Sequence, residues 1–311
     1  MSADKLALTI SARSHFIEGD NYLKSRNWSN WTNYLYPVPA LIMVLAFLIA
    51  PVIFVIFTSF TDWDLLNPMK FVGLKNYIRI FTDTNLIIST KNTLIWVVMI
   101  LLVPMVLGLL FAVFIKNIWF SNRIKSIFYI PLAISGAGIG VIWRWIFSRT
   151  GLLSTALVSM GIIDEPVSWL LNSPFNTFAM VIAATWQITG INMILFLMGL
   201  QNIPSEVLEA SKIDGASDWK TFINIILPLL RQTVTVVVIL NIIGGFKVFD
   251  IIWVMTAGGP ARFSETLAVS MYKESFGMFR MGYGSSIAVV LSLIIFIVGI
   301  GYLRIVGKEN Q

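Results

Sequence analysis

Long apolar segments alternate with polar, turn-rich segments along the whole chain. Each apolar segment is about 20 residues long, which is the length of α-helix that crosses the hydrocarbon core of a bilayer. The pattern therefore predicts an all-α membrane protein with six transmembrane helices. The predicted spans lie near residues 39–60, 93–115, 127–147, 178–200, 232–254 and 285–305.

The distribution of positive charge predicts how these spans are oriented. The segments on one side, which include both termini, hold 12 lysines and arginines, and the segments on the other side hold 8. Because Lys and Arg are enriched in cytoplasmic loops, we expect both termini in the cytoplasm. The expected parts are a cytoplasmic tail over 1–37, a six-helix membrane domain over 38–306 and a second cytoplasmic tail over 307–311.

Composition narrows the possible chemistry. Hydrophobic residues make up 57% and charged residues 12% of the 311 residues, and the mean hydropathy is +0.82, which excludes a soluble globular domain. The chain has no cysteine, and its single histidine, His15, lies in the polar tail, so no metal site is expected. The sequence has no GxxxxGK[ST] phosphate-binding loop, and its spans lack the usual catalytic patterns. We therefore expect neither enzymatic activity nor a bound cofactor, and the net charge of +6 requires no nucleic-acid partner.

A polar island over residues 203–228 separates the fourth and fifth predicted spans. It predicts a short helix, a turn and a second helix. Glu206 lies near the positive end of the first helix dipole, and Gly215 can end that helix in a left-handed conformation. Ser217 or Asp218 can cap the second helix. By these residues alone, the island could be an ordinary connecting loop.

The same island resembles the EAA loop of the membrane subunits of bacterial ABC importers. The likeness rests on Glu209-Ala210, Asp214-Gly215-Ala216 and Leu227-Pro228, and Ser211, still small enough to pack closely against a partner, replaces the usual Ala. In that family the loop is a coupling helix that docks in a cleft of the cytoplasmic ATPase subunit. The resemblance implies ATPase coupling by Glu206, Glu209, Ala210, Ser211, Asp214, Gly215 and Ala216.

Two segments on the predicted outer side extend the resemblance to permeases of carbohydrate importers. Phe71-Val72-Gly73-Leu74-Lys75-Asn76-Tyr77 looks like the FxGLxNY segment of sugar-importer permeases. Thr256 with Gly258, Gly259 and Pro260 is similar to the Gly-Gly-Pro signature of the first of the two permeases in such importers. Taken alone, either segment could be only a turn.

The resemblance covers nearly everything from Phe71 to about residue 305. It implies a permease of the bacterial inner membrane that forms half of the translocation pathway for a sugar, oligosaccharide or polyol. It also implies a second homologous permease, two ATPase subunits that bind ATP and Mg, and an extracytoplasmic binding protein as partners. The alternative is an ion-coupled secondary transporter or a channel, which would need a relay of titratable residues within the spans. The residues do not identify the sugar, and they leave an anionic substrate such as glycerol phosphate open.

The resemblance also places a substrate path on two helices. The sugar-contacting positions of the family fall on Gln187, Ile188 and Ile191 in the fourth span and on Asn241 and Gly245 in the fifth. Only two of these five residues are polar, so the substrate does not carry over. By the residues alone, a polar group inside a bundle is as well suited to bond a neighbouring helix as to line a path.

Charged and small residues within the spans predict specific contacts. Lys247 and Asp250 are three residues apart, and we expect them to form a structural ion pair rather than to contact substrate. Arg144, near the end of the third span, is expected to reach the outer interface. Gly136 and Gly140, four residues apart, predict a close contact between helices.

Overall fold

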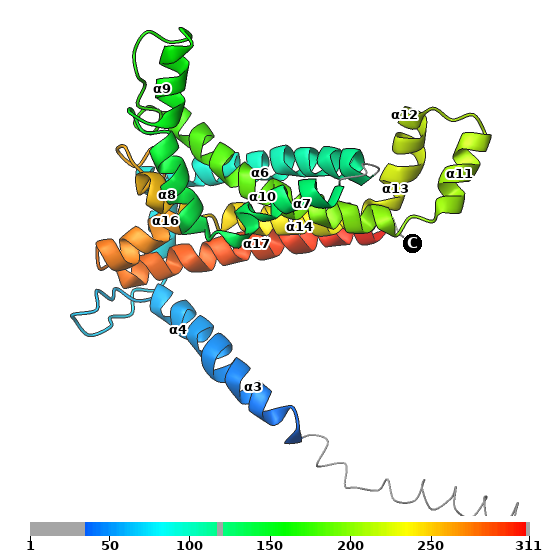
Figure 1. The fold of residues 1–311 in the computed structure, drawn as a ribbon. Helices are drawn as coiled ribbons and strands as arrows, with labels where there is room; N and C mark the ends of the chain where they lie inside the picture. The colour runs from blue at the N-terminus through cyan, green and yellow to red at the C-terminus, as the bar shows by residue number, and fades with distance from the viewer. Residues whose placement is uncertain (1–34, 117–120, 309–311) are drawn as a thin grey trace, which may run out of the picture. The chain divides into compact units, whose positions relative to one another are not determined.

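The computed structural model describes residues 35–116 and 121–308, and most of these residues are helical (Figure 1). Most of the predicted tail over 1–37, including His15, lies outside the described residues, as does the end of the predicted tail over 307–311.

The first predicted span is a helix in three parts. They are α3 (Val38–Val44), the π-helical turn η1 (Leu45–Ile49) and α4 (Ala50–Ser59). The chain divides into two compact units, one ending at Phe54 and one beginning at Val55. Most apolar side chains along this helix are exposed, as expected of a helix that faces lipid or another subunit.

Four long helices form the body of the second unit. They are α6 (Thr84–Lys116), α10 (Phe175–Gln201), α14 (Arg231–Phe246) and α17 (Met281–Lys308). Helices α10 and α14 pack on α6, and α14 also packs on α17 (Figure 1). With the first helix, five helices of the described chain are long and apolar enough to span a membrane. This agrees with an all-α membrane protein, and a sixth span exists only if one bent pair of helices is counted.

That bent pair replaces the straight helix predicted over 127–147. Helix α7 (Ser121–Tyr129) and the 3-10 turn η2 (Pro131–Ala133) meet α8 (Gly136–Ile146) at 103°. Proline has no N–H to donate and restrains the residue before it, so the chain leaves the helix near Pro131. Ser135 then begins α8, because its side chain accepts a hydrogen bond from the Gly138 N–H at 3.1 Å.

Helix α8 packs against α15 (Asp250–Thr256), and two glycines make the close approach possible. A Cβ on Gly140 would lie 2.9 Å from Val254 Cβ, and one on Gly136 would lie 3.2 Å from Asp250 Oδ2. The predicted glycine contact between helices is therefore confirmed.

Short elements lie at the two ends of the bundle (Figure 1). At one end, which we call the inner end, are α11 (Ser205–Ile213), α12 (Asp218–Thr221), the π-helical turn η3 (Phe222–Ile226) and α13 (Leu227–Leu229). The opposite, outer end carries α5 (Lys75–Thr82), α8, α9 (Leu152–Ser159), α15, α16 (Leu267–Tyr272) and the π-helical turn η4 (Lys273–Gly277).

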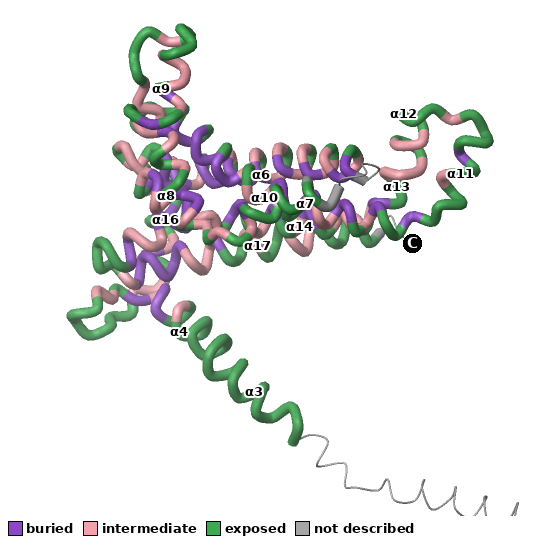
Figure 2. The backbone as a smooth tube through the Cα atoms, in the orientation of Figure 1, coloured by how far each residue is buried: buried purple, intermediate pink, exposed green. Residues whose placement is uncertain are grey.

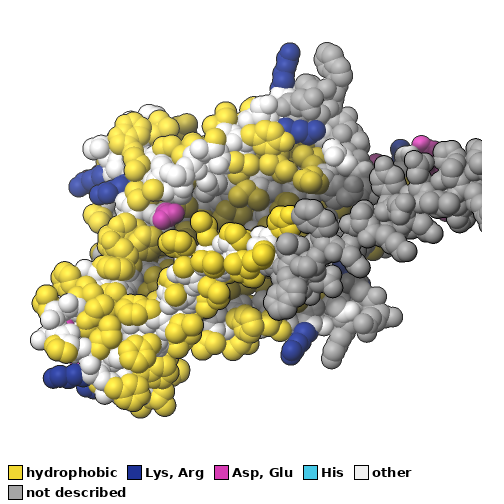
Figure 3. All heavy atoms as spheres, turned by 90° about the horizontal axis from the view of Figure 1, so that it is seen from below, with side chains coloured by type: hydrophobic (Ala, Val, Ile, Leu, Met, Phe, Trp, Pro, Cys, Tyr) yellow, Lys and Arg dark blue, Asp and Glu magenta, His cyan; other side chains and the backbone are white. Residues whose placement is uncertain are grey.

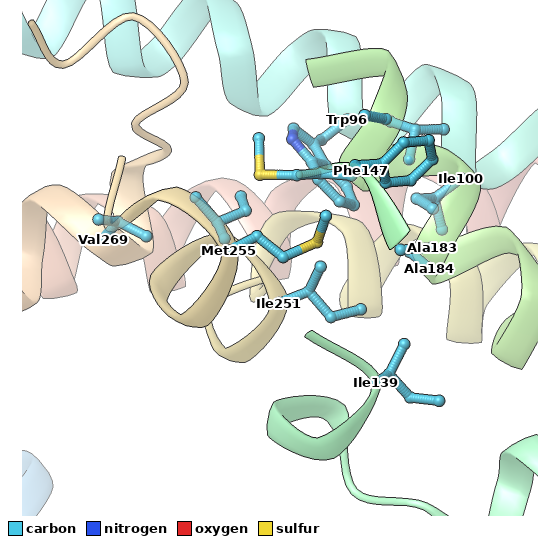
Figure 4. Packing of buried hydrophobic residues seen from close by; sticks show 13 residues of the cluster. Trp96, Ile100, Ile139, Phe147, Ala183, Ala184, Ile251, Met255 and Val269 are labelled. Carbon is cyan, nitrogen blue, oxygen red and sulfur yellow. The ribbon is translucent and has the colours of Figure 1, made fainter. Parts of the chain in front are cut away.

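The buried core of the second unit runs along the contacts of α6 with its neighbours, and the exposed surface is also largely apolar (Figures 2 and 3). Figure 4 shows one cluster, in which Trp96 of α6, Phe147 beside α8, Ala184 of α10 and Met255 of α15 come together. Lipid tails are as apolar as these side chains, so the hydrophobic effect does not drive helices together inside a bilayer. Close van der Waals packing of this kind holds them together instead.

Candidate functional site: coupling segment and translocation path

The inner hairpin, formed by α11 and α12, is shaped by local capping. Gly215 follows α11 with a φ of 75°, a left-handed conformation that favours glycine and ends the helix. The Ser217 hydroxyl accepts a hydrogen bond from the Lys220 N–H at 3.4 Å and caps α12. The predicted helix, turn and cap are therefore all present. Of the two capping residues that the sequence allowed, Ser217 and Asp218, the structure uses Ser217.

Most predicted coupling residues lie on the surface of this hairpin. The exposed ones are Glu206, Glu209, Ala210, Asp214 and Gly215, and Ala216 is half-buried. Two large apolar side chains are exposed beside them, Ile213 at 86% and Trp219 at 71%. A small protrusion that exposes apolar and acidic side chains together is typical of a surface that binds a partner.

Ser211 behaves differently from the other predicted coupling residues. It is buried, its hydroxyl donates to the Leu208 carbonyl at 2.8 Å, and the Thr221 hydroxyl lies 3.4 Å away. Ser211 therefore packs inside the hairpin, whereas the sequence predicted a contact with a partner. A small residue is needed there because α11 and α12 approach each other at this point.

A cavity of about 880 Å³ separates the inner hairpin from the ends of the long helices. Its walls include Leu110 and Phe114 of α6, Leu200 of α10, and Leu208 and Trp219 of the hairpin. Leu208 of α11 packs against the buried cluster formed by α6, α10 and α14, and the neighbouring space is not filled by side chains.

The five predicted path residues do not share one environment. Gln187 is half-buried, and its Nε2 donates to the carbonyls of Ile134 at 2.8 Å and Pro131 at 3.3 Å. The Ile134 carbonyl lies at the bend between α7 and α8, and Gln187 supplies it with a donor, whereas the Pro131 carbonyl also accepts from the Ile134 N–H at 3.3 Å. Ile188 is half-buried and Ile191 is 41% exposed.

The two predicted path residues of α14 face α6. Asn241 is only 4% exposed, and Gly245 is buried where a Cβ would lie 3.0 Å from the Val97 Cα. In this conformation they belong to a packed helix contact rather than to the wall of an open cavity.

Several polar groups within the bundle have no hydrogen-bond partner among the described residues. Asn192 lacks a partner for both side-chain atoms, and Asn241 lacks one for Nδ2. Thr185 and Thr189 are also unpaired, and with Asn192 they lie on one face of α10. A buried polar group without a partner costs about 1–3 kcal/mol, so a water molecule, a substrate or another subunit that bonds to these residues would be stabilising.

The predicted ion pair between Lys247 and Asp250 is wrong, because no ion pair joins them in the described chain. Helix α14 ends before Lys247, and Phe249 leaves the helical region with φ −136° and ψ −60°, so the two residues do not share a helix face. The Asp250 carboxylate instead lies in the first turn of α15 and beside Gly136 at the start of α8, where helix dipoles favour negative charge.

Arg144 is exposed near the end of α8 and makes a contact that the sequence did not reveal. Its Nη1 donates to the Val254 carbonyl at 3.2 Å, so it joins α8 to the last turn of α15. A cation at the carbonyl end of a helix is favoured by the helix dipole.

The Gly-Gly-Pro turn that follows α15 is anchored to two long helices. Asn92 of α6 donates to the carbonyls of Phe263 and Glu265 at 2.7 and 2.9 Å. The Gly259 carbonyl accepts from Ser264 Oγ at 2.6 Å and from Asn176 Nδ2 of α10 at 3.3 Å. This signature segment is thus rigidly placed at the outer end.

Sequence reasoning missed a buried ionic network in the same loop. Glu265 is fully buried and accepts from Arg262, from Lys273 Nζ at 2.8 Å and from Ser270 Oγ at 2.6 Å. Arg262 and Arg280 also pair with the buried Glu274, at 3.2 and 3.3 Å. Burial alone would raise the pKa of the Glu265 carboxyl, but the hydrogen bonds from Arg262, Lys273 and Ser270 outweigh burial and lower it. The alternation of charges between 262 and 280 was the available signal.

The segment that begins at Phe71 has a structural role. Asn76 Nδ2 donates to the carbonyls of Ser59 and Thr61 at 3.0 and 2.8 Å, and the Tyr77 hydroxyl contacts Ser59 Oγ at 2.6 Å. These bonds satisfy groups that the end of α4 leaves free.

Comparison with known proteins gives this arrangement a family. The family model described as "Binding-protein-dependent transport system inner membrane component" matches residues 104–308. The chain is 37% identical over 277 residues to the osmoprotective compounds uptake permease protein GgtC of Synechocystis sp. This alignment covers 87% of this chain and 97% of GgtC. It is 35% identical over 280 residues to the arabinooligosaccharides transport system permease protein AraP of Bacillus subtilis. That alignment covers 88% of this chain and 88% of AraP.

The fold is also known from a solved structure. A chain of a bacterial ABC transporter involved in the import of the acidic polysaccharide alginate matches with a TM-score of 0.81 and 18% identity, covering 93% of this chain and 100% of that chain. The chain therefore belongs to the inner membrane components of binding-protein-dependent transport systems, which are the permeases of ABC importers.

Proposed function

We propose that this permease forms half of the translocation pathway for a sugar, oligosaccharide or polyol. AraP is named for arabinooligosaccharides, and the alpha-glucoside transport system permease protein AglF of Rhizobium meliloti is 32% identical over 285 residues, covering 89% of this chain and 83% of AglF. Neutral, hydroxyl-rich substrates suit helices that carry amides and aromatic rings rather than rows of charge. The ion-coupled alternative gains no support from these relatives.

The proposed assembly contains a second homologous permease, two ATPase subunits that bind ATP and Mg, and an extracytoplasmic binding protein. The chain then spans the bacterial inner membrane six times, with α7 and α8 counted as the bent third span and both termini in the cytoplasm. The exposed apolar side chains of the first helix and of α17 support this arrangement, because they need lipid or a second subunit to cover them.

In this proposal α11 is the coupling helix. The observation that carries it is the inner hairpin itself, which exposes Glu209 and Ile213 and leaves a cavity between α11 and the bundle. ATPase closure would push α11, and because α10 ends only a few residues before α11, the push would tilt α10. The two states must differ in their contacts for this motion to be driven.

The unpaired amide of Asn241 supports a path between α6 and α14 in the other state. If these helices separate, Asn241 gains a partner in water or substrate. We expect Asn241→Ala to weaken uptake by the assembled transporter without reducing the amount of complex. Unchanged uptake kinetics would assign Asn241 to helix packing alone.

The experiment that tests the proposed function is purification of the tagged chain from its own membranes in mild detergent. Co-elution with an ATPase and a second permease in near-equal amounts, and ATPase stimulation by a sugar-loaded binding protein, are the expected results. A chain that elutes alone and supports ion-dependent uptake in vesicles would contradict the proposal.

A further inference from the structure

A second cavity, of about 320 Å³, lies at the outer end between α8, α15 and the Gly-Gly-Pro turn. We name it the outer cavity, and the residues used below are Arg144, Leu171, Trp253, Thr256 and Gly259. None of the predicted path residues lines it. Its volume is at the small end of the range for ligand pockets, which suits one sugar ring rather than a chain of rings.

Most polar groups in its wall are already bonded within the protein. The Thr256 hydroxyl is 2.9 Å from Ser264 Oγ and donates to the Ile252 carbonyl at 3.2 Å. The Gly259 carbonyl accepts from Ser264 and Asn176. Among the side chains of the wall, the Arg144 guanidinium and the Trp253 indole are then the groups best suited to contact a polar ligand.

Arg144 has donors to offer. A guanidinium carries several N–H groups, and the structure uses one of them, on Nη1, for the Val254 carbonyl. Within residues 35–116 and 121–308 no carboxylate forms an ion pair with Arg144. The side chain is thus held in place by a neutral carbonyl, and its other donors can bind hydroxyl groups or a carboxylate.

Trp253 is held rigidly by other rings. Phe249 stacks on it with centroids 5.7 Å apart and planes at 13°, and Tyr272 meets it edge-on at 4.8 Å and 65°. Phe276 extends this row by packing on Tyr272 at 5.2 Å. Because its neighbours fix the indole, a ligand that packs on it pays little for ordering the side chain.

We propose that the outer cavity binds one ring of a saccharide at the entrance of the pathway. The apolar C–H face of the ring packs on the Trp253 indole, and hydroxyl groups on its edge accept hydrogen bonds from Arg144. This inference deepens the proposed function and rests on the substrate being a carbohydrate. It assigns a receiving site at the outer end, away from the α10 and α14 residues considered above.

The test uses the assembled transporter in lipid nanodiscs without binding protein, with maltose and arabinotriose as probes in saturation-transfer NMR. We expect saturation transfer to at least one probe, an affinity about three- to tenfold weaker in Trp253→Leu, and near-normal affinity in Trp253→Phe. Trp145→Leu is the matched control, because Trp145 lies on α8, is 68% exposed and does not line the cavity. Leu171→Trp, at an exposed position in the wall, should also weaken binding by narrowing the cavity.

Two outcomes would overturn this inference. One is the same saturation transfer, or none, in the wild type and Trp253→Leu complexes. The other is an unchanged probe affinity in Trp253→Leu together with weaker association of the binding protein, measured separately by adding it to the same nanodiscs, which would make the cavity a protein-docking surface. Uptake of the two probes by the complete transporter, measured in parallel, tests the proposed function separately, because a wild-type complex can import a saccharide whether or not the outer cavity holds it.

Discussion

The outer loop, which we define as residues 257–280 between α15 and α17, and the inner hairpin both connect membrane helices, yet they are built in opposite ways. In the outer loop, Glu265 and Glu274 are buried among three cations, and Asn92 ties the backbone to α6. In the inner hairpin most predicted coupling residues are exposed, and a cavity lies behind α11. The difference indicates a rigid outer end and a more lightly supported inner end.

The largest expected effect on stability is at Glu265. Glu265→Gln removes the buried negative charge that pairs with Arg262 and Lys273. Breaking a buried ion pair in this way lowers the free energy of unfolding by about 3–5 kcal/mol. The measurement is the Tm of the purified transporter, with Glu206→Gln, an exposed glutamate of the inner hairpin, as the control. A Tm of Glu265→Gln equal to that of the wild type would show that the ionic network does not stabilise the outer loop.

A smaller loss is expected at Asn92. Asn92→Ala leaves the buried carbonyl of Glu265 and the partly buried carbonyl of Phe263 without the Asn92 donor, at a cost of about 1–3 kcal/mol. Asn172→Ala, at an exposed asparagine of the outer end, is the matched control. If both variants unfold at the wild-type temperature, the loop is held by its ionic network alone.

Acid should weaken the outer loop selectively. The folded-state pKa of Glu265 lies below its ordinary value of 4.5, so its stabilising effect is complete above about pH 4.5 and is lost as the pH falls through the folded-state pKa. The difference in Tm between wild type and Glu265→Gln should therefore be constant from about pH 7 to about pH 5 and shrink below that range. A difference that shrinks on going to higher pH would contradict the sign of this pKa shift.

A substitution in the inner hairpin is expected to have the smallest effect on stability and the largest effect on the coupling of ATP hydrolysis to uptake. Glu209→Ala should change the free energy of unfolding by no more than about 0.5 kcal/mol, because the side chain is exposed. It should still separate ATP hydrolysis from uptake in the reconstituted transporter. Glu165→Ala, an exposed glutamate of the outer end, is the control, and normal uptake by Glu209→Ala would refute the coupling role.

The sequence predicted the features that depend on neighbouring residues. Five of the six apolar segments became helices long enough to span a membrane, Gly215 and Ser217 shaped the inner hairpin, and Gly136 and Gly140 made a close helix contact. Each of these follows from the length, the capping chemistry or the size of a few adjacent side chains.

Other features were decided only by the tertiary structure. The 103° bend between α7 and α8, the absence of a Lys247–Asp250 pair among the described residues and the bonds of Gln187 depend on what each helix meets. The network around Glu265 likewise joins residues whose order along the chain leaves their partners open. Local sequence determines which helices form and where they begin and end, whereas the partner of a buried charge or amide is set by the packing of distant segments, since such a group must be paired wherever the fold places it.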